Sequence, residues 1–438
     1  MPHGDSPSSL LSHVFRGTLP IEWQHKDRCE IEMKEILLRH DAENNTNGVA
    51  IGYKTAVSFA ILLAIFLVIG VWPAGGNALF VCAFFGALFI YLGSRPNLLH
   101  VGLSLAAAAA IAFLYRILHL ASVSSLTAPH GFVALVEQME GAGAFLGAGS
   151  IVAMGLDAVW TGSSRYVSAL RDSLVLPLFT LLAALCMQVT AIFPHASFDW
   201  LLYRFDAGLG LAPGYLAASL FRKVPWLRNG SYLTYKGLLM FPAAYQGWAS
   251  LKGKAAKINL IHAFVIAGII GFVLYQICPA IGPRATFGQS FPDHLPAASA
   301  VPGSVFMSKS VPNATPSLHM TWALLVWVAA WELGWFASLN ASIFVIFTGF
   351  ATVGMGEHYL VDLIVSVPLV MMVRGICAAR PRLTASGLGL VGAWLVYLRM
   401  GFHVPFFLNW LFIVATVVTA ALLMRSSAAW SGSQSASP

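Results

Sequence analysis

The sequence predicts an all-α fold, a polytopic bundle of transmembrane helices. Of its 438 residues, 58% are hydrophobic and only 10% are charged, and the mean hydropathy is +0.75. A soluble domain carries about 25% charged residues and has no interior large enough for this much apolar surface. The apolar residues also gather in long runs, and about 20 such residues are enough for a helix to cross a bilayer. The bilayer is therefore predicted to be the solvent for most of the chain.

The first 54 residues differ from the rest because they are polar. Charged residues such as Glu30, Lys34 and Arg39 are interleaved with apolar ones, which is typical of a short amphipathic helix. The segment lacks the apolar core of a cleavable signal peptide. We therefore expect residues 1–54 to form a cytoplasmic N-terminal segment.

Twelve apolar runs follow this segment, and each is predicted to be a membrane span. The two halves of the chain show no internal repeat, which weakens a transporter interpretation. The runs cover about residues 56–72, 77–93, 99–118, 142–160, 173–193, 229–250, 258–277, 318–337, 341–356, 359–375, 386–399 and 405–424, with each end placed to within several residues.

The basic residues between the runs predict the orientation. Three lysines at 252–257 precede one span, and three arginines at 374–382 follow another. Because cytoplasmic loops are enriched in Lys and Arg, both termini are predicted to be cytoplasmic. The net charge of +7 is spread over these loops, so we expect no nucleic-acid partner. The five cysteines lack the spacing of a metal site.

One basic cluster, Arg222, Lys223 and Arg228, falls on the opposite side if the spans alternate. We interpret the 194–228 loop as an extracytoplasmic amphipathic segment, and the alternative is a different span parity in this region.

The same loop contains Asp199 and Asp206, which are seven residues apart and share a face if this stretch is helical. Two interpretations stay open at this point. The stretch is either an interfacial helix with a solvated acidic edge, or a lid or acceptor-binding element over a site.

Two histidines and an aspartate open neighbouring apolar runs. His319 stands at the start of one run, and His358 and Asp362 stand at the start of another, 39 residues later. Ionisable groups are costly in hydrocarbon, so their presence at span mouths indicates chemistry at the bilayer surface. The predicted orientation places all three on the extracytoplasmic face. A single histidine in such a place is more often an interfacial anchor, but the whole set is not explained in that way.

This set of residues fits phosphoryl transfer through a phosphohistidine. Such a mechanism needs a neutral imidazole as nucleophile, a carboxylate that orients it and an acid for the leaving alkoxide. We assign these roles to His358, Asp362 and His319, respectively. Ser317 precedes the His319 span and offers a hydroxyl and a backbone N–H at a helix N-terminus, which favours anion binding.

At these residues the chain resembles the type 2 phosphatidic acid phosphatase superfamily. Ser317 with His319 matches its second motif, and His358 with Asp362 matches its third. Within the superfamily the chain is most similar to the branch of the inositol phosphorylceramide and sphingomyelin synthases. The resemblance covers roughly residues 258–375.

The chain departs from the superfamily pattern at its cations. Hydrolytic members carry a serine-arginine pair where this chain has Ala351 and Thr352, and a first-motif lysine where it has Ile277. A phosphoryl-transfer site needs positive charge against the phosphate oxygens. We therefore expect Arg284 and Lys309 to bind the substrate phosphate together with protonated His319.

The resemblance also implies a domain organisation and an activity. Accessory spans at 55–172 would precede a six-span catalytic core at 173–375, and C-terminal spans and a short tail at 376–438 would follow. The implied activity is a lipid phosphotransferase that moves a phospho-head group, such as phosphoinositol, from a phospholipid to a lipid alcohol, without a metal or other cofactor. One alternative is a lipid phosphate phosphatase with water as acceptor. An alternative of another class is a transporter or flippase without catalysis.

Overall fold

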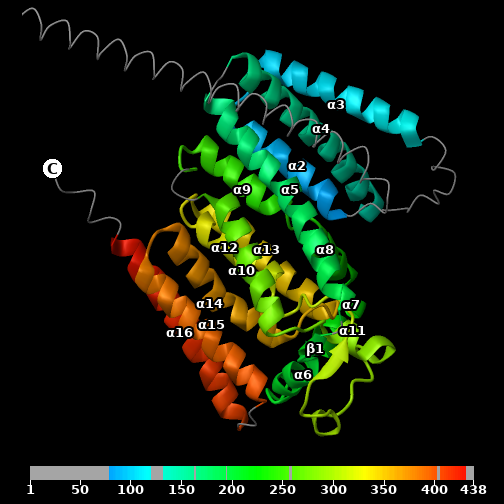
Figure 1. Ribbon diagram of the computed structural model, residues 1–438, viewed down its shortest axis with the longest axis vertical. Helices are drawn as coiled ribbons and strands as arrows, with labels where there is room; N and C mark the ends of the chain where they lie inside the picture. The colour runs from blue at the N-terminus through cyan, green and yellow to red at the C-terminus, as the bar shows by residue number, and fades with distance from the viewer. Residues whose placement is uncertain are drawn as a thin grey trace, which may run out of the picture. The chain divides into compact units, whose positions relative to one another are not determined.

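A computed structural model describes residues 78–119, 132–161, 164–193, 195–255, 259–401 and 405–430. All of these lie in one compact unit that begins at Ala60. The expected N-terminal segment 1–54 and the span at about 56–72 lie outside the described residues. The regular secondary structure of the described part is helical apart from one pair of short strands, and the all-α prediction is confirmed (Figure 1).

Eight of the described helices are long and apolar enough to cross a membrane. These are α3 (Leu98–His119), α4 (Phe132–Trp160), α5 (Ser164–Ile192), α10 (Leu260–Ile277), α13 (Trp335–Gly354), α14 (Leu360–Cys377), α15 (Pro381–Met400) and α16 (Phe406–Trp430). Two apolar helices are shorter, α2 (Ala78–Gly93) and α12 (Leu318–Ala330). The remaining helices are α6 (Asp199–Ala207), α7 (Pro213–Lys223), α8 (Pro225–Lys236), α9 (Met240–Leu251) and α11 (Pro283–Phe287).

The outer surface of these helices is apolar. Leu182, Leu185 and Val189 on α5 are all more than half exposed, at 60%, 55% and 57%. A soluble protein rarely exposes contiguous apolar surface of this kind, whereas a helix in a bilayer directs such side chains toward lipid. Together with the eight spanning helices, this surface identifies an integral membrane protein.

The single span expected at about 229–250 is wrong. This stretch forms two helices of 12 residues each, α8 and α9, separated by a turn at 237–239. Pro242 stands in the first turn of α9, where its missing N–H leaves no hydrogen bond of the helix unmade, so its position agrees with a helix that begins at Met240. The break leaves α8 as a separate helix at the polar end of the core.

The core that carries the site lies among α10, α12, α13 and α14. Val326, Ala341 and Leu369 are fully buried in it, one from each of the last three helices. A close approach joins α10 to the start of α12, since a Cβ atom on Gly271 would lie 2.4 Å from the Leu318 side chain. Helix α14 packs on both α12 and α15.

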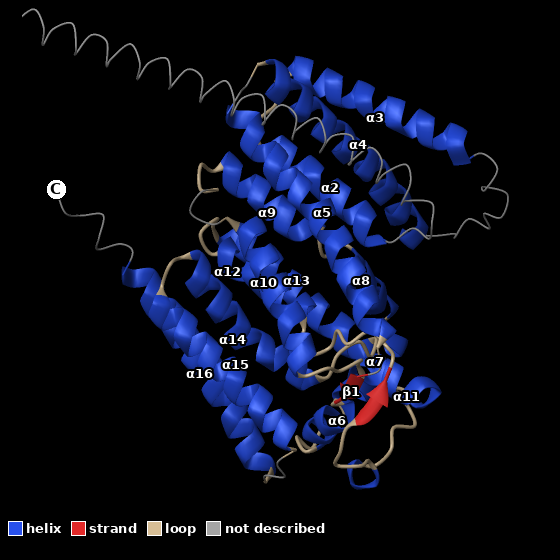
Figure 2. Cartoon of the chain, in the orientation of Figure 1, coloured by secondary structure: helices blue, strands red, loops and turns tan. Residues whose placement is uncertain are grey.

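A layer of short elements covers one end of this core (Figures 1 and 2). Strand β1 (His195–Ser197) pairs antiparallel with β2 (Phe306–Ser308), and Arg222 on α7 pairs with Asp293 at 2.9 Å. These contacts place the 194–228 segment and the 280–315 loop at the same end of the molecule. The structure therefore places this segment at the end of the core where the histidine-bearing helices begin, and the side of the membrane stays a prediction.

Candidate active site

Three hydrogen bonds join the beginning of α12 to the first two turns of α14. The Thr315 hydroxyl donates to the Asp362 carboxylate at 2.6 Å, and the backbone N–H of Ser317 donates to the Asp362 carbonyl at 3.2 Å. The Ser366 hydroxyl donates to the Ser317 carbonyl at 2.7 Å. All four residues are fully buried. The two helix starts therefore form one unit, although 39 residues separate their histidines in the chain.

This unit brings His319 and His358 together. His319 is the second residue of α12, and His358 lies just before Tyr359, the N-cap of α14. Nε2 of His358 is 3.4 Å from Nδ1 of His319, and the ring centroids are 5.6 Å apart. His358 is 2% exposed.

The backbone carbonyl of Ala314 orients the His358 ring. Nδ1 of His358 lies 2.8 Å from this oxygen, and because a carbonyl only accepts, Nδ1 carries the proton. The lone pair of the neutral ring is then on Nε2, the nitrogen that faces His319. Asp362, to which the sequence analysis assigned the orienting role, does not hold the ring by a direct hydrogen bond, because its carboxylate lies 3.8 Å from Nδ1, beyond hydrogen-bond reach.

Asp362 instead organises the backbone around His358. One carboxylate oxygen accepts the N–H of Tyr359 at 2.8 Å, and the other accepts the Thr315 hydroxyl. The carboxylate holds the start of α14 against the segment that precedes α12. At 3.8 Å it is also close enough to stabilise a positive charge on the His358 ring.

Tyr235 on α8 positions the other histidine, and the sequence analysis did not identify it. Its ring stacks on His319 with centroids 4.2 Å apart and an angle of 12° between the planes. The stretch that contains Tyr235 was interpreted as part of one continuous span, which hid its place at the site. The only sequence signal was the polar character of residues 228–236 within an apolar run.

Ser317 has a structural task in this unit. Its hydroxyl caps α12 by accepting the N–H of Met320 at 3.3 Å, and its own N–H is bonded to Asp362. These groups are occupied within the protein. The anion-binding role expected for Ser317 therefore has no support in the geometry.

The two predicted cations lie in different surroundings. Arg284 is the second residue of α11, and its backbone N–H donates to the carbonyl of Gly356, two residues before His358, at 2.8 Å. Its side chain lines a cavity of about 750 Å³. Lys309 is exposed just beyond β2 and is not among the residues that line this cavity.

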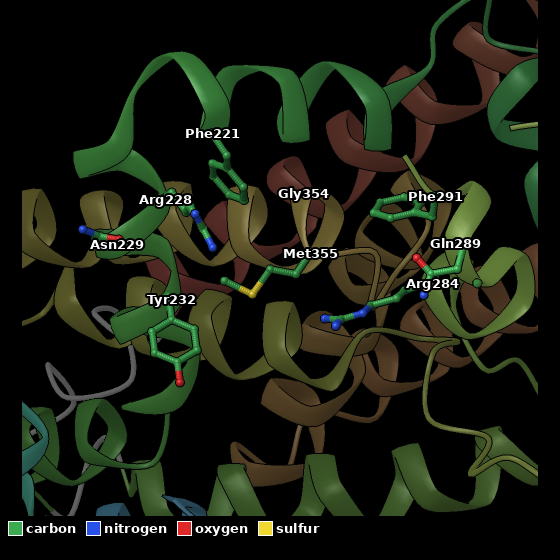
Figure 3. Close-up of a pocket in the computed structure, with 10 residues that line it drawn as sticks. Phe221, Arg228, Asn229, Tyr232, Arg284, Gln289, Phe291, Gly354 and Met355 are labelled. Carbon is green, nitrogen blue, oxygen red and sulfur yellow. The ribbon is translucent and has the colours of Figure 1, made fainter. Parts of the chain in front are cut away.

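Polar side chains from two separate parts of the chain line this cavity (Figure 3). Arg228, Asn229 and Tyr232 come from α8, and Arg284 and Gln289 come from α11 and the turn after it. Arg228 belongs to the basic cluster that contradicted the simple orientation rule. Its position at this cavity gives that cluster a place beside the histidine-bearing loop.

Asp199 holds the loop that leads to Arg284. Its carboxylate accepts the N–H groups of Ile281 at 2.9 Å and Gly282 at 2.8 Å, as well as the Ser197 hydroxyl. Gly282 has a φ of 86°, and a Cβ atom there would lie 2.3 Å from the Glu357 carbonyl, so only glycine fits this close approach. Burial raises the pKa of Asp199, and the hydrogen bonds from Ser197 and Ile281 oppose that effect.

Asp206, two turns later on α6, caps α14. Its two carboxylate oxygens accept the N–H groups of Leu360 at 2.7 Å and Val361 at 3.1 Å. Burial raises the pKa of Asp206 to about 8, although these backbone donors act in the opposite direction. Asp199 and Asp206 do share a helix face, but they are 0% and 5% exposed, so the solvated acidic edge is wrong. Helix α6 therefore connects the loop that leads to Arg284 with the start of α14.

Residues 200–376 match the family model of the PAP2 superfamily. No curated protein and no solved structure matches the chain. The matched segment runs from α6 to α14 and includes His319, His358 and Asp362. The match supports the type 2 phosphatidic acid phosphatase superfamily that the motifs predicted. Its members are phosphatases and phosphotransferases, and this protein is an enzyme of that kind.

Proposed function

We propose, with the PAP2 superfamily match of residues 200–376 as the premise, that the protein is a lipid phosphotransferase. It would move a phospho-head group from a phospholipid to a lipid alcohol through a phosphohistidine on His358. The observation that carries the proposal is the orientation of the histidine pair. The Ala314 carbonyl holds the proton on Nδ1 of His358, so the Nε2 lone pair faces His319.

The first half-reaction forms the phosphoenzyme. Nε2 of His358 attacks phosphorus, the N–P bond forms, and the bond from phosphorus to the leaving alkoxide breaks. Protonated His319 gives its proton to the departing oxygen. The phosphorylated ring keeps its Nδ1 proton and becomes cationic, and the nearby Asp362 carboxylate stabilises that charge.

The second half-reaction reverses these roles. His319, now neutral, accepts the proton of the incoming hydroxyl, whose oxygen attacks phosphorus. The N–P bond breaks, and His358 returns to the neutral ring with its lone pair on Nε2. The enzyme ends in its starting protonation state, so no further proton donor is needed.

Substrate binding must move His319. In-line transfer places the leaving oxygen on the far side of phosphorus from the attacking nitrogen. The present separation of 3.4 Å between the two nitrogens equals one near-attack contact and leaves no room for phosphorus between them. The ring of Tyr235 offers a flat surface along which His319 turns away.

The lack of a third-motif arginine favours a phosphodiester donor. Ala351 and Thr352 are fully buried, and the Thr352 hydroxyl is bonded to the Thr348 carbonyl at 2.9 Å, so neither position supplies a cation. A phosphodiester carries one negative charge and requires less neutralisation than a phosphomonoester. This supports the transferase over the phosphatase alternative, in which water replaces the lipid alcohol.

The head group and the side of the membrane are further parts of the proposal. Resemblance to the inositolphosphotransferase branch, which rests on the motifs, makes phosphoinositol the first head group to test. The distribution of basic loop residues favours a site at the extracytoplasmic surface.

The test offers the purified protein two donors in parallel. Phosphatidylinositol is supplied with ceramide or diacylglycerol, phosphatidic acid is supplied alone, and products are identified by lipid mass spectrometry. We expect head-group transfer to the lipid alcohol, lost in His358→Ala. Phosphate release from phosphatidic acid without any transfer would establish the phosphatase instead. Absence of any His358-dependent turnover would favour the transporter alternative.

A further inference from the structure

The cavity beside the histidine pair contains two arginines without partners. Neither the Arg228 nor the Arg284 guanidinium has a hydrogen-bond or ion-pair partner among the described residues, although both line the same space of about 750 Å³. Figure 3 shows the two side chains extending toward Met355 from opposite sides. Two unpaired cations that face one another across a cavity repel each other unless an anion lies between them.

Packing of α8 on α13 determines the position of Arg228. A Cβ atom on Gly230 would lie 2.4 Å from the Phe347 ring, so α8 approaches α13 as closely as a glycine permits. Trp226 contacts the same ring, with centroids 6.2 Å apart. These contacts hold Arg228 beside the end of α13, near Gly354 and Met355, which also line the cavity.

The cavity is continuous with the backbone that carries the nucleophile. Arg284 is bonded through its N–H to Gly356, and Met355 stands three residues before His358. On the other side, Tyr232 lies one turn before Tyr235, whose ring stacks on His319. A group bound between the two arginines therefore lies beside the segments that lead to the two histidines, although neither imidazole lines the cavity.

We infer that this cavity binds the phosphate-bearing head group of the donor lipid, and that Arg228 is a substrate-binding residue. Arg228 contributes positive charge to this cavity from α8, and Arg284 contributes it from α11. The amides of Asn229 and Gln289 and the hydroxyl of Tyr232 are available to hydrogen-bond polar groups attached to the phosphate. The inference rests on the proposed function, since it names the site at which the donor of that reaction binds.

Binding is measured separately from turnover. All variants are made in the His358→Ala background, which cannot form the phosphoenzyme, and the probe is glycerophosphoinositol, a water-soluble phosphodiester. Its Kd is measured by calorimetry on protein in phosphatidylcholine nanodiscs. Arg228→Gln tests the assignment, and Arg228→Lys keeps the charge but removes the planar fork. The matched control is Lys223→Gln, which removes one exposed positive charge from the neighbouring helix outside the cavity.

We expect Arg228→Gln to weaken binding by about tenfold or more, as loss of a charge-assisted hydrogen bond does. The Kd of Arg228→Lys should lie between the values for Arg228→Gln and the parent. Lys223→Gln should keep the Kd within about twofold of the parent value, which would exclude a general effect of charge. Equal Kd values for Arg228→Gln and the parent, or no measurable binding of the probe, would overturn the inference. An equal loss of probe affinity in Arg228→Gln and Lys223→Gln would also overturn the inference.

The result is independent of the proposed activity. If head-group transfer depends on His358 but probe binding is unchanged by substitution of Arg228, the proposed function is supported and the cavity assignment is wrong. If probe binding depends on Arg228 but wild-type protein turns over no lipid, the cavity assignment stands and the phosphotransferase proposal falls. In the active protein, Arg228→Gln should raise KM for phosphatidylinositol more than it lowers kcat, because Arg228 contacts the donor and not the departing oxygen.

Discussion

Removal of the Asp206 carboxylate should loosen the loop that carries His358. In Asp206→Ala the N–H groups of Leu360 and Val361, now bonded at 2.7 and 3.1 Å, both lose their acceptor. An unsatisfied buried donor costs about 1–3 kcal/mol, so the pair costs about 2–6 kcal/mol. A cavity of about 60 Å³ borders Asp206 and has room for a water molecule, which places the expected cost in the lower part of that range.

Hydrogen exchange measures this effect at the two amides concerned. A loss of about 2 kcal/mol in local opening free energy accelerates exchange by about 30-fold, since 1.4 kcal/mol corresponds to a factor of ten. Peptides that cover Leu360 and Val361 should show this acceleration, and peptides from the middle of α10 should not. Activity should fall strongly too, because a displacement of about 1 Å at a nucleophile can cost about 100-fold.

Asp293→Ala is the control for Asp206→Ala. It removes a carboxylate from the same end of the molecule, but Asp293 forms a surface ion pair with Arg222 and its side chain is 45% exposed. Such pairs contribute about 0–1 kcal/mol. If Asp206→Ala exchanges no faster than Asp293→Ala at the start of α14, helix α6 does not brace the catalytic loop and the reasoning fails.

Three further predictions concern the chemistry at the site. A donor with a better leaving group should restore activity to His319→Ala more than to His358→Ala, because only the former lacks the acid, whose removal costs about 10²–10⁴-fold; equal rescue in a steady-state assay would contradict the assigned roles. Tyr235→Leu should lower kcat with little change in KM, whereas Tyr235→Phe should retain activity, since the stacked ring and not the hydroxyl contacts His319; a matching loss in both would exclude stacking. The Asp206 pKa is raised from 3.8 to about 8, so its contribution to stability is complete below the lower value and is lost as the pH rises through the higher one. Thermal unfolding midpoints of Asp206→Asn should therefore vary less with pH between 4 and 8 than those of the wild type, and parallel curves would refute this.

The site residues differ in how far the sequence could identify them. His319, His358 and Asp362 were identifiable because ionisable groups at span mouths are rare and their spacing matches known motifs. Tyr235 and Arg228 were not, because their importance comes from the packing of α8 on α13 and not from any local pattern. The role of Ala314 was also beyond the sequence, since any residue provides a backbone carbonyl. Asp206 was noticed, but whether it faces solvent or the start of α14 depends on tertiary contacts.

Composition and apolar periodicity by themselves determined that this is a helical membrane protein, because lipid imposes one requirement on every span: an apolar surface with internally satisfied backbone groups. Because apolar content is the same in one long span and in two shorter helices, the sequence could not show that residues 229–250 form two helices. Only the tertiary structure decided which nitrogen of His358 carries the lone pair, what Asp199 and Asp206 bind, and that Arg228 and Arg284 line the same cavity. Each of these depends on contacts between segments far apart in the chain, and their geometry is set by the packing of α6, α8, α12 and α14.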